Sequence, residues 1–491
     1  MEIAFSAVIG EGVSQFISFL MSKYSNNAAS EEQKMGRLQH LLLRVRTVVE
    51  EADGRYITNS GMVEQLQVLA DAMYRGYRLL DSFSCGRPNP LMEEVSNTSA
   101  LSFRSPPKRC RTITFGRKAK AVSLDQSLDD TLDRLETAVA HMAEFVVLLG
   151  GCERLSRRPY DAHLYIDNFM FGRHAEKQRL LNFLLHQNSS TGSPPPVLSV
   201  IGDRSVGKRT LVAHVCNDKR VTSHFSLILH LNEGDLFRVE EEHERLAKGK
   251  ILIVVEFDSV VVDEEDWVKF YSSVTNMKKG SKVVIISKHR EFEKIATVKP
   301  IFLNTLPYEE FRYLFKILAF GSTNPMEHLQ LLRIVDELSK ELQLGWSLVT
   351  ANVLGEALRT NLDVRFWLCM LNKTRRITER NMSVFGAYPK ALAERGHHVD
   401  MTDLELIPGA PFHLAWTTKA HDDSVKKELP KVTIRELMVD PTARPKGDFI
   451  MIIWQSRIPP HTCFGHFVPN CDQGMRQHVL LSGRKRRGVL L

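Results

Sequence analysis

The stretch VLSVIGDRSVGKRTL, residues 197–211, decides the fold of this chain of 491 residues. A short apolar run ends at Gly202, four residues follow, and Gly207-Lys208 opens a predicted helix. This order of strand, loop and helix is that of a phosphate-binding loop, G-x-x-x-x-G-K-[ST]. In such a loop, backbone N–H groups and the positive end of the helix dipole surround phosphate oxygens. The stretch therefore predicts an α/β domain with a nucleotide site at Gly202, Val206, Gly207 and Lys208.

The residue after the lysine departs from this pattern. Ser or Thr normally stands there because its hydroxyl binds Mg²⁺, whereas this chain has Arg209 and places Thr210 one position later. Two unit charges about 4 Å apart interact by ~4 kcal/mol at an effective dielectric constant of 20, so a guanidinium here repels Mg²⁺ and attracts phosphate. We therefore predict phosphate binding without metal, or none, unless Arg209 turns outward and Thr210 replaces it. Hydrolysis needs Mg²⁺ and a positioned water, so we assign no catalytic residue and expect a weak ATPase at most.

Composition sets further bounds. The length corresponds to about three domains, and a net charge of +7 is too small for this size to indicate nucleic-acid binding. Seven scattered cysteines form no disulfide pattern and favour a reducing compartment. The apolar stretch 3–21 contains Glu11 and falls short of a clean membrane-spanning run of about 20 apolar residues. We expect no signal peptide or transmembrane segment, and a cytoplasmic location with the nucleus as the alternative.

The first third of the chain is predicted to be helical. Apolar residues recur at helical spacing in four stretches, 9–20, 30–49, 61–80 and 123–149. Such helices predict an N-terminal helical bundle over residues 1–152. Proline, serine and basic residues in 85–120 predict an irregular basic insert, with a nuclear-localisation signal or a patch for an acidic partner as the alternative.

Strands and helices alternate after residue 153. Apolar runs predict strands at 226–231, 251–255 and 283–286, in addition to the strand that ends at Gly202. This alternation predicts a doubly wound parallel sheet in a nucleotide-binding domain over residues 153–305, with the ligand at the carboxyl ends of the strands.

The remainder of the chain is predicted as two parts. A helical pattern covers residues 306–375, and short β-like runs at 431–435 and 449–454 predict a β-rich domain of unknown role over residues 376–491. No leucine-rich repeat is found.

Two features near the C-terminus are weak candidates for function. His461, Cys463, His466 and Cys471 lie close together, but their spacing fits no standard zinc pattern, so no metal site is assigned. The basic run at 484–487 is typical of a nuclear-localisation signal or of a solvated tail.

Several motifs in a fixed order resemble the coiled-coil class of plant NLR immune receptors, especially the grass type. These are the N-terminal helices, Phe171-Gly172-Arg173, the stretch 280–288 and the stretch 306–321. The resemblance covers about residues 1–360. It implies an NB-ARC module that binds ADP or ATP, followed by an ARC1-like helical domain. It also implies that Gly172 and Arg173 lie near adenine and sugar, and that Lys288 occupies the sensor position.

The resemblance further implies a role in plant defence through contacts with other proteins. The N-terminal helical domain would associate with itself or with another receptor of the family, and nucleic acid is not expected as a partner.

The chain departs from the family at every motif around the nucleotide. The second acidic motif falls on Glu256-Phe257-Asp258, where Phe257 separates the carboxylates and alternation predicts Glu256 and Asp258 on one side. Asp258 or Glu256 is therefore the candidate acid beside the metal. Lys288 replaces an arginine fork by a simple cation, and Ser347 replaces the proline that meets adenine in the family.

The acidic run of the family's third helix falls on residues 77–81. Tyr77 and Arg78 replace carboxylates there and Asp81 remains, so the usual contacts of that run are in doubt. With the altered nucleotide motifs, this predicts a truncated, degenerate NLR-like protein. Two alternatives stay open: a nucleotide-driven switch with slow ATP hydrolysis that uses Thr210 and Asp258, and a structural or decoy partner that binds no nucleotide.

Overall fold

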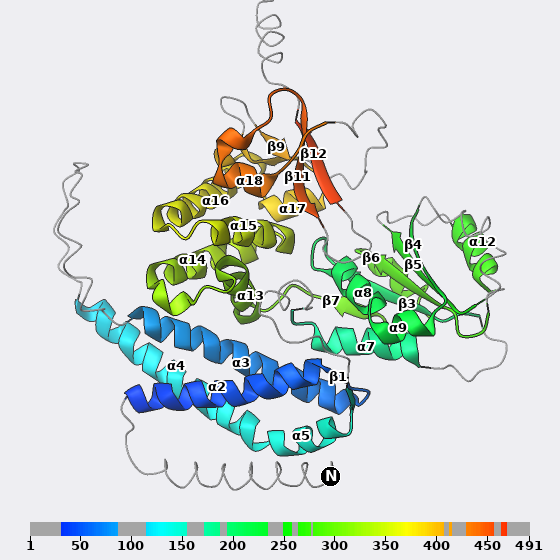
Figure 1. Cartoon of the computed structure of the whole chain (residues 1–491), viewed down its shortest axis with the longest axis horizontal. Coiled ribbons are helices and arrows are strands. Elements are labelled where there is room, and N and C mark those ends of the chain that lie inside the picture. The colour runs from blue at the N-terminus through cyan, green and yellow to red at the C-terminus, as the bar shows by residue number, and fades with distance from the viewer. Residues whose placement is uncertain are drawn as a thin grey trace, which may run out of the picture.

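The computed structural model describes residues 31–86, 114–154, 171–186, 194–233, 249–257, 264–275, 278–406, 412–414, 429–455 and 463–468. In Figure 1 the N-terminal helices (blue and cyan) lie along one side of the molecule, and the central parallel sheet (green) lies beside them. A stack of helices (yellow-green) connects both to a small C-terminal sheet (orange and red). This mixed α/β architecture confirms the predicted fold class.

The N-terminal helices enclose a core of their own. They are α2 (Glu31–Asp53), α3 (Ser60–Gly86), α4 (Thr114–Ala140) and α5 (Met142–Gly150). Leu38, Leu66 and Leu135 are almost completely buried between them, as the helical spacing of apolar residues requires. The predicted helix at 9–20 lies outside the described residues.

Two boundaries in this part differ from the sequence prediction. The helix predicted at 123–149 is divided at His141, whose backbone N–H and ring Nδ1 both approach the carbonyl of Thr137, at 3.2 and 2.7 Å. In addition, α4 begins at Thr114, inside the segment 85–120 that was predicted to be irregular. A short antiparallel pair, β1 (Arg55–Tyr56) and β2 (Glu153–Arg154), closes the domain.

The central sheet has five parallel strands in the order β4-β5-β6-β3-β7. Apolar clusters cover both of its faces, which explains why its strands read as continuous apolar runs. The strands are β3 (Val197–Gly202), β4 (Leu227–Asn232), β5 (Ile251–Phe257), β6 (Lys282–Ser287) and β7 (Ile301–Leu303). The helical elements beside them are α7 (His174–Leu185), α8 (Lys208–Cys216), α9 (Lys219–His224), α12 (Glu264–Thr275) and η3 (Arg290–Glu293).

A helical region follows the sheet. It comprises α13 (Tyr308–Phe320), η4 (Pro325–Glu327), α14 (Leu329–Gly345), α15 (Leu348–Thr360), α16 (Val364–Phe385) and α17 (Pro389–Glu394). Helix α16 continues across residues 375–376, where the sequence placed a domain boundary, because its buried stripe runs on through Ile377 and Asn381.

The C-terminal residues share one hydrophobic core with this helical region, from Leu306 to Val468. Strand β10 is parallel to β11, and β11 is antiparallel to β12. The predicted strand at 431–435 ends at Thr433, because Thr433 and Glu436 form a capping box that starts a helix. The elements are β8 (Val399–Asp400), η5 (Thr402–Leu404), β9 (His413–Leu414), β10 (Lys431–Thr433), α18 (Ile434–Val439), η7 (Pro441–Ala443), β11 (Phe449–Gln455) and β12 (Cys463–Val468).

Within the described part of the chain, no helix is both long and apolar enough to cross a bilayer. The same residues contain no cluster of potential metal ligands. His461 and Cys471 lie outside the described residues.

Candidate nucleotide-binding site

A tight turn joins β3 to α8 at the carboxyl edge of the sheet. Ser205 and Gly207 have left-handed backbone angles, with φ of +61° and +97°. Gly207 caps α8 without any side-chain hydrogen bond, so the first N–H groups of the helix stay available to an anion. A Cβ on Gly202 would lie 2.4 Å from the carbonyl oxygen of Leu303 on β7, so only glycine fits there. With buried Val206, these residues build the shape of a phosphate-binding turn.

Lys208 bends back over this turn. Its Nζ donates hydrogen bonds to the carbonyl oxygens of Gly202 at 2.6 Å and Asp203 at 2.7 Å. Burial lowers the pKa of Lys208 to about 8, although Glu256 and Asp203 oppose that shift. A phosphate in the turn would supply the negative charge that this half-buried ammonium lacks.

Arg209 forms an ion pair with the acid at the end of β5. Its Nε donates to both carboxylate oxygens of Glu256, each at 2.5 Å. The guanidinium carbon also lies 5.9 Å from the ring centre of Phe464 on β12. Glu256, one of the two acids expected beside a metal, is thus already paired with a cation, and this pair does not fit Mg²⁺.

The side chains of Glu256 and Phe257 point to opposite sides of β5, as the sequence predicted. Phe257 is buried with its ring centre 4.7 Å from that of Phe292, while Glu256 reaches α8. Asp258 lies outside the described residues. Thr210 sits half-buried in the first turn of α8, and Lys288 is half-buried directly after β6.

Gly172 and Arg173 lie next to the phosphate-type turn and support it. Both have left-handed φ angles, of +62° and +61°, and a Cβ on Gly172 would lie 1.7 Å from Oε1 of Glu310. The buried guanidinium of Arg173 donates to the carbonyl of Val206 at 3.4 Å and to the carbonyl of Asn304. Arg173 therefore positions the turn through backbone contacts.

A buried charge group behind Arg173 was missed by sequence reasoning. His174 Nδ1 lies 2.5 Å from Oδ1 of Asp53, which belongs to the N-terminal helices. Burial alone would lower the pKa of His174, but Asp53 raises it above its usual value. Burial also raises the pKa of Glu310 to about 7, against the opposing charges of His174 and Arg173. No local pattern signals these contacts because the partners are more than 100 residues apart.

The structure also brings Ser347 to the loop. Ser347 caps α15 by accepting a hydrogen bond from the N–H of Thr350 at 3.2 Å. Ser347, Thr350, Arg204 and Ser205 line the same cavity, between the loop and the C-terminal core. This cavity therefore adjoins the phosphate-type turn and extends from it into the C-terminal core.

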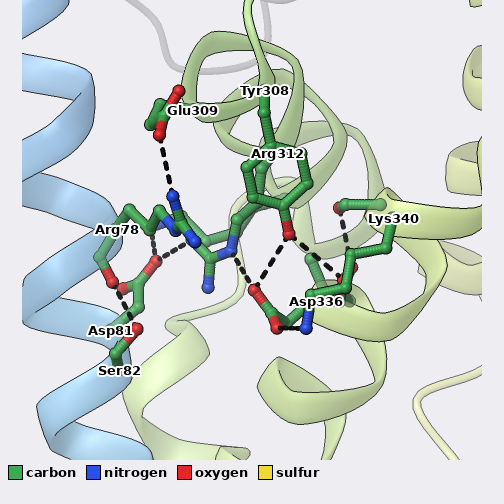
Figure 2. Close-up of polar contacts among 11 residues, drawn as sticks. Arg78, Asp81, Ser82, Tyr308, Glu309, Arg312, Asp336 and Lys340 are labelled. Carbon is green, nitrogen blue, oxygen red and sulfur yellow. Dashed lines mark hydrogen bonds and ion pairs between the residues drawn. The ribbon is translucent and has the colours of Figure 1, made fainter. Parts of the chain in front are cut away.

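A second charge cluster joins the N-terminal helices to the helical region. Asp81 on α3 is almost completely buried and accepts hydrogen bonds from Arg312 Nη1 at 2.8 Å and Lys316 Nζ at 2.7 Å. Figure 2 shows Arg312 between Asp81 and Asp336, with its Nε 2.8 Å from Oδ1 of Asp336. Nearer the surface, Arg78 donates to Glu309 at 2.7 Å.

The substituted positions of the acidic run take part in this junction. The ring of Tyr77 packs at a tilt against Tyr313 of α13 with ring centres 5.0 Å apart, and Tyr74 and Phe171 extend the aromatic group. The contacts that were in doubt from the sequence thus exist in another form, with Asp81 as the buried acid.

No family model matches the chain. It is 24% identical over 327 residues to a putative disease resistance protein of Arabidopsis thaliana, which covers 60% of this chain and 22% of that protein. It is 23% identical over 362 residues to disease resistance protein RGA2 of Solanum bulbocastanum, which covers 68% of this chain and 35% of that protein. The chain thus spans only about a fifth to a third of the length of these relatives.

A solved structure, the E. coli MS115-1 HORMA:CdnC:Trip13 complex, matches 43% of this chain and 90% of that chain, with a TM-score of 0.30 and 14% identity. This likeness is too low to carry a functional argument. The sequence relatives are more informative because several agree. At 22–24% identity, the chain is distantly similar to plant disease resistance proteins of the coiled-coil, nucleotide-binding and leucine-rich-repeat type, over its nucleotide-binding region.

Proposed function

We propose that this chain is an NLR-like plant defence protein whose degenerate NB-ARC module binds ADP or ATP weakly and without Mg²⁺. In this proposal it acts through contacts with other proteins in the cytoplasm. The observation that carries the nucleotide part is the ion pair between Arg209 and Glu256. It places a permanent cation beside the phosphate turn and pairs Glu256, one of the two candidate acids for a metal, with that cation.

The turn itself supports phosphate binding. The uncapped start of α8, the glycine at 202 and the half-buried ammonium of Lys208 all favour an anion at this place. The phosphates of ADP or ATP would contact the loop, with Arg209 close enough to assist. Because the same guanidinium opposes a divalent cation, hydrolysis is not part of this proposal.

The test measures ADP and ATP affinity by calorimetry, with and without Mg²⁺, on the native chain, Lys208→Ala and Arg209→Thr. For the native chain we expect weak binding whose affinity is the same with and without Mg²⁺. In Lys208→Ala the affinity should fall about tenfold or more, because one charge-assisted contact is lost. Arg209→Thr should introduce a dependence on Mg²⁺. The matched control is Arg179→Thr, which removes one positive charge at an exposed position of α7.

Two outcomes would contradict the nucleotide part. Magnesium-dependent turnover by the native chain, abolished in Lys208→Ala, would favour the working switch. Undetectable binding that Arg209→Thr does not restore would favour a structural or decoy partner.

The proposed partner surface lies on the N-terminal helices. Leu43 and Val68 are 62% and 61% exposed, and Val147 is 57% exposed, on three different helices. Exposed apolar side chains of this kind favour contacts with another protein, either a second copy or another NLR. We expect Leu43→Glu combined with Val68→Glu to abolish self-association in sedimentation experiments. Leu344→Glu, at a 69% exposed position of α14, is the control, and equal effects of both changes would refute this surface.

A further inference from the structure

A cavity of about 70 Å³ lies in the core shared by the helical region and the C-terminal elements. Its walls are buried apolar side chains from helices α15, α16 and α18 and from strand β11, among them Val353, Leu354, Ile377, Ile434 and Ile453. Because one water needs roughly 10–15 Å³ by the same measure, there is space for about five water-sized groups. A branched hydrocarbon side chain of four carbons suits this volume.

Two opposite charges from different elements also line the cavity. Glu394 on α17 has a buried Oε1 without a hydrogen-bond partner, and its ion pair with Lys390 Nζ, at 3.8 Å, is longer than a hydrogen bond. Arg204 of the phosphate-type turn is half-buried and forms no hydrogen bond or ion pair with another described residue. Glu394 and Arg204 line the same cavity and are near enough for the Arg204 charge to lower the pKa of Glu394, which burial raises.

The backbone beside Arg204 is also strained. Ser205, which follows Arg204 and lines the cavity, has a φ of +61°. A residue other than glycine rarely adopts this region of backbone angles, and such strain is concentrated at ligand sites.

A ligand for this place must combine three groups: an anion for Arg204, a cationic donor for Glu394 and a hydrocarbon group for the interior. An α-amino acid carries all three on one carbon atom. We propose that this cavity binds a free α-amino acid with a branched apolar side chain, such as leucine. Its carboxylate lies at Arg204, its ammonium group at Glu394 and its side chain between α15 and β11. This ligand is distinct from ADP or ATP, so the inference goes beyond the proposed function.

The adenine of a nucleotide is a poorer occupant of the same interior. Its ring nitrogens and amino group need hydrogen-bond partners when buried, and leaving one unpaired weakens binding. The hydroxyl of Thr374 lines the cavity but already donates to the carbonyl of Met370 at 2.8 Å. Ser347 and Thr350 also line the cavity, but most of its lining side chains are apolar and favour hydrocarbon over a polar heterocycle.

The first test compares four probes on the full chain by calorimetry: leucine, leucinamide, N-acetylleucine and alanine. Leucinamide lacks the carboxylate and N-acetylleucine lacks the ammonium group. We expect leucine to bind about tenfold to hundredfold more tightly than either, because each loses one hydrogen bond to a charged group. Alanine lacks three of leucine's carbons, and a loss of about fourfold in affinity for each buried carbon predicts a total loss of about sixtyfold.

The second test measures the affinity of the same probes for variants of the cavity residues. Arg204→Ala should remove the preference for leucine over leucinamide but keep the preference over N-acetylleucine, and Glu394→Gln should do the opposite. Ala393→Leu, which fills the cavity from α17, should abolish leucine binding. Ala391→Leu on the same helix is the control because Ala391 does not line the cavity.

Three results would overturn the proposal. The first is leucine binding that does not saturate up to its solubility limit. The second is equal affinity for leucine, leucinamide and N-acetylleucine. The third is an Arg204→Ala or Glu394→Gln variant, folded by circular dichroism, that weakens all probes equally.

Discussion

Arg209 places a permanent cation where this type of loop normally presents a hydroxyl, and Glu256 meets it with both carboxylate oxygens. Neither residue alone predicts this outcome, because an unpaired arginine would only weaken metal binding. Together they turn a potential metal site into an internal ion pair. At the scale of single residues, the chemistry of the site therefore depends on a contact across 47 positions of sequence.

Lys208 should make the proposed nucleotide binding sensitive to pH. Burial lowers its pKa from 10.5 to about 8, so the ammonium is charged below pH 8 and loses its proton as the pH rises through 8. We expect ADP affinity to fall by up to about tenfold between pH 7 and 9, since the charged form binds phosphate. Titration calorimetry at several pH values measures this. The same fall in Lys208→Ala would show that another group is responsible.

A substitution at Gly202 would test how closely the loop approaches β7. A Cβ in Gly202→Ala would lie 2.4 Å from a backbone oxygen that cannot move aside. We expect the free energy of unfolding to fall by about 2 kcal/mol or more, as in other overpacked sites. Chemical denaturation measures the change. Gly36→Ala in α2 is the control: nothing lies within 4 Å of its Cβ, so it should be neutral or stabilising by up to about 1 kcal/mol.

At the scale of elements, α3 and α13 are joined by charge as well as by aromatic packing. Asp81 faces two cations in a buried setting, whereas the pair Arg78–Glu309 is partly exposed. A buried ion is costly once it loses its partner, but an exposed pair contributes little. The junction should thus depend mainly on Asp81.

Removing the charge of Asp81 should loosen this junction. We expect Asp81→Asn to destabilise the packing of α3 on α13 by about 3–5 kcal/mol, because Arg312 and Lys316 stay buried with less compensation. Hydrogen exchange of α3 and α13 measures the effect. Arg78→Ala, at a pair that is 42% and 26% exposed, should cost less than about 1 kcal/mol. Equal exchange in the two variants would contradict this ranking.

At the scale of the whole molecule, the C-terminal sheet reaches the nucleotide turn. In Figure 1 the strand β12 (red) lies above α8, and Phe464, near the start of β12, lies against the Arg209 guanidinium. Phe464 also stacks on Trp454 of β11, with ring centres 5.7 Å apart. The same arginine therefore contacts the parallel sheet and the C-terminal sheet.

This contact predicts that the stability of β12 is coupled to that of the first turn of α8. Phe464→Ala removes a cation–π contact of about 0.5–2 kcal/mol, so we expect faster hydrogen exchange in β12 and in the first turn of α8. Phe467→Ala is the matched control, because Phe467 lies on the opposite face of the same strand and is 38% exposed. An unchanged first turn of α8 in Phe464→Ala would show that the contact does not couple the sheets.

Much of the fold was predictable from local pattern. The strands at 226–231, 251–255 and 283–286 are found within one or two residues, because parallel strands buried on both faces need continuous apolar runs. The division at His141 and the continuation of α16 past residue 376 were not predicted. The ring of His141 contacts the carbonyl of Thr137, and the buried stripe of α16 includes the polar residues Thr378 and Asn381, so apolar periodicity records neither feature. The domain boundaries stay predictions.

The sequence by itself determined the order of strand, turn and helix at residues 197–211 and the glycines that the turn needs. It also determined the departures at Arg209, Phe257 and Ser347, since these are local facts of composition and spacing. Only the tertiary structure decided the partners: Glu256 and Phe464 for Arg209, Arg312 and Lys316 for Asp81, and Glu394 beside the cavity. Charge pairing and burial depend on which distant segments meet in space, and no spacing within a segment encodes that meeting.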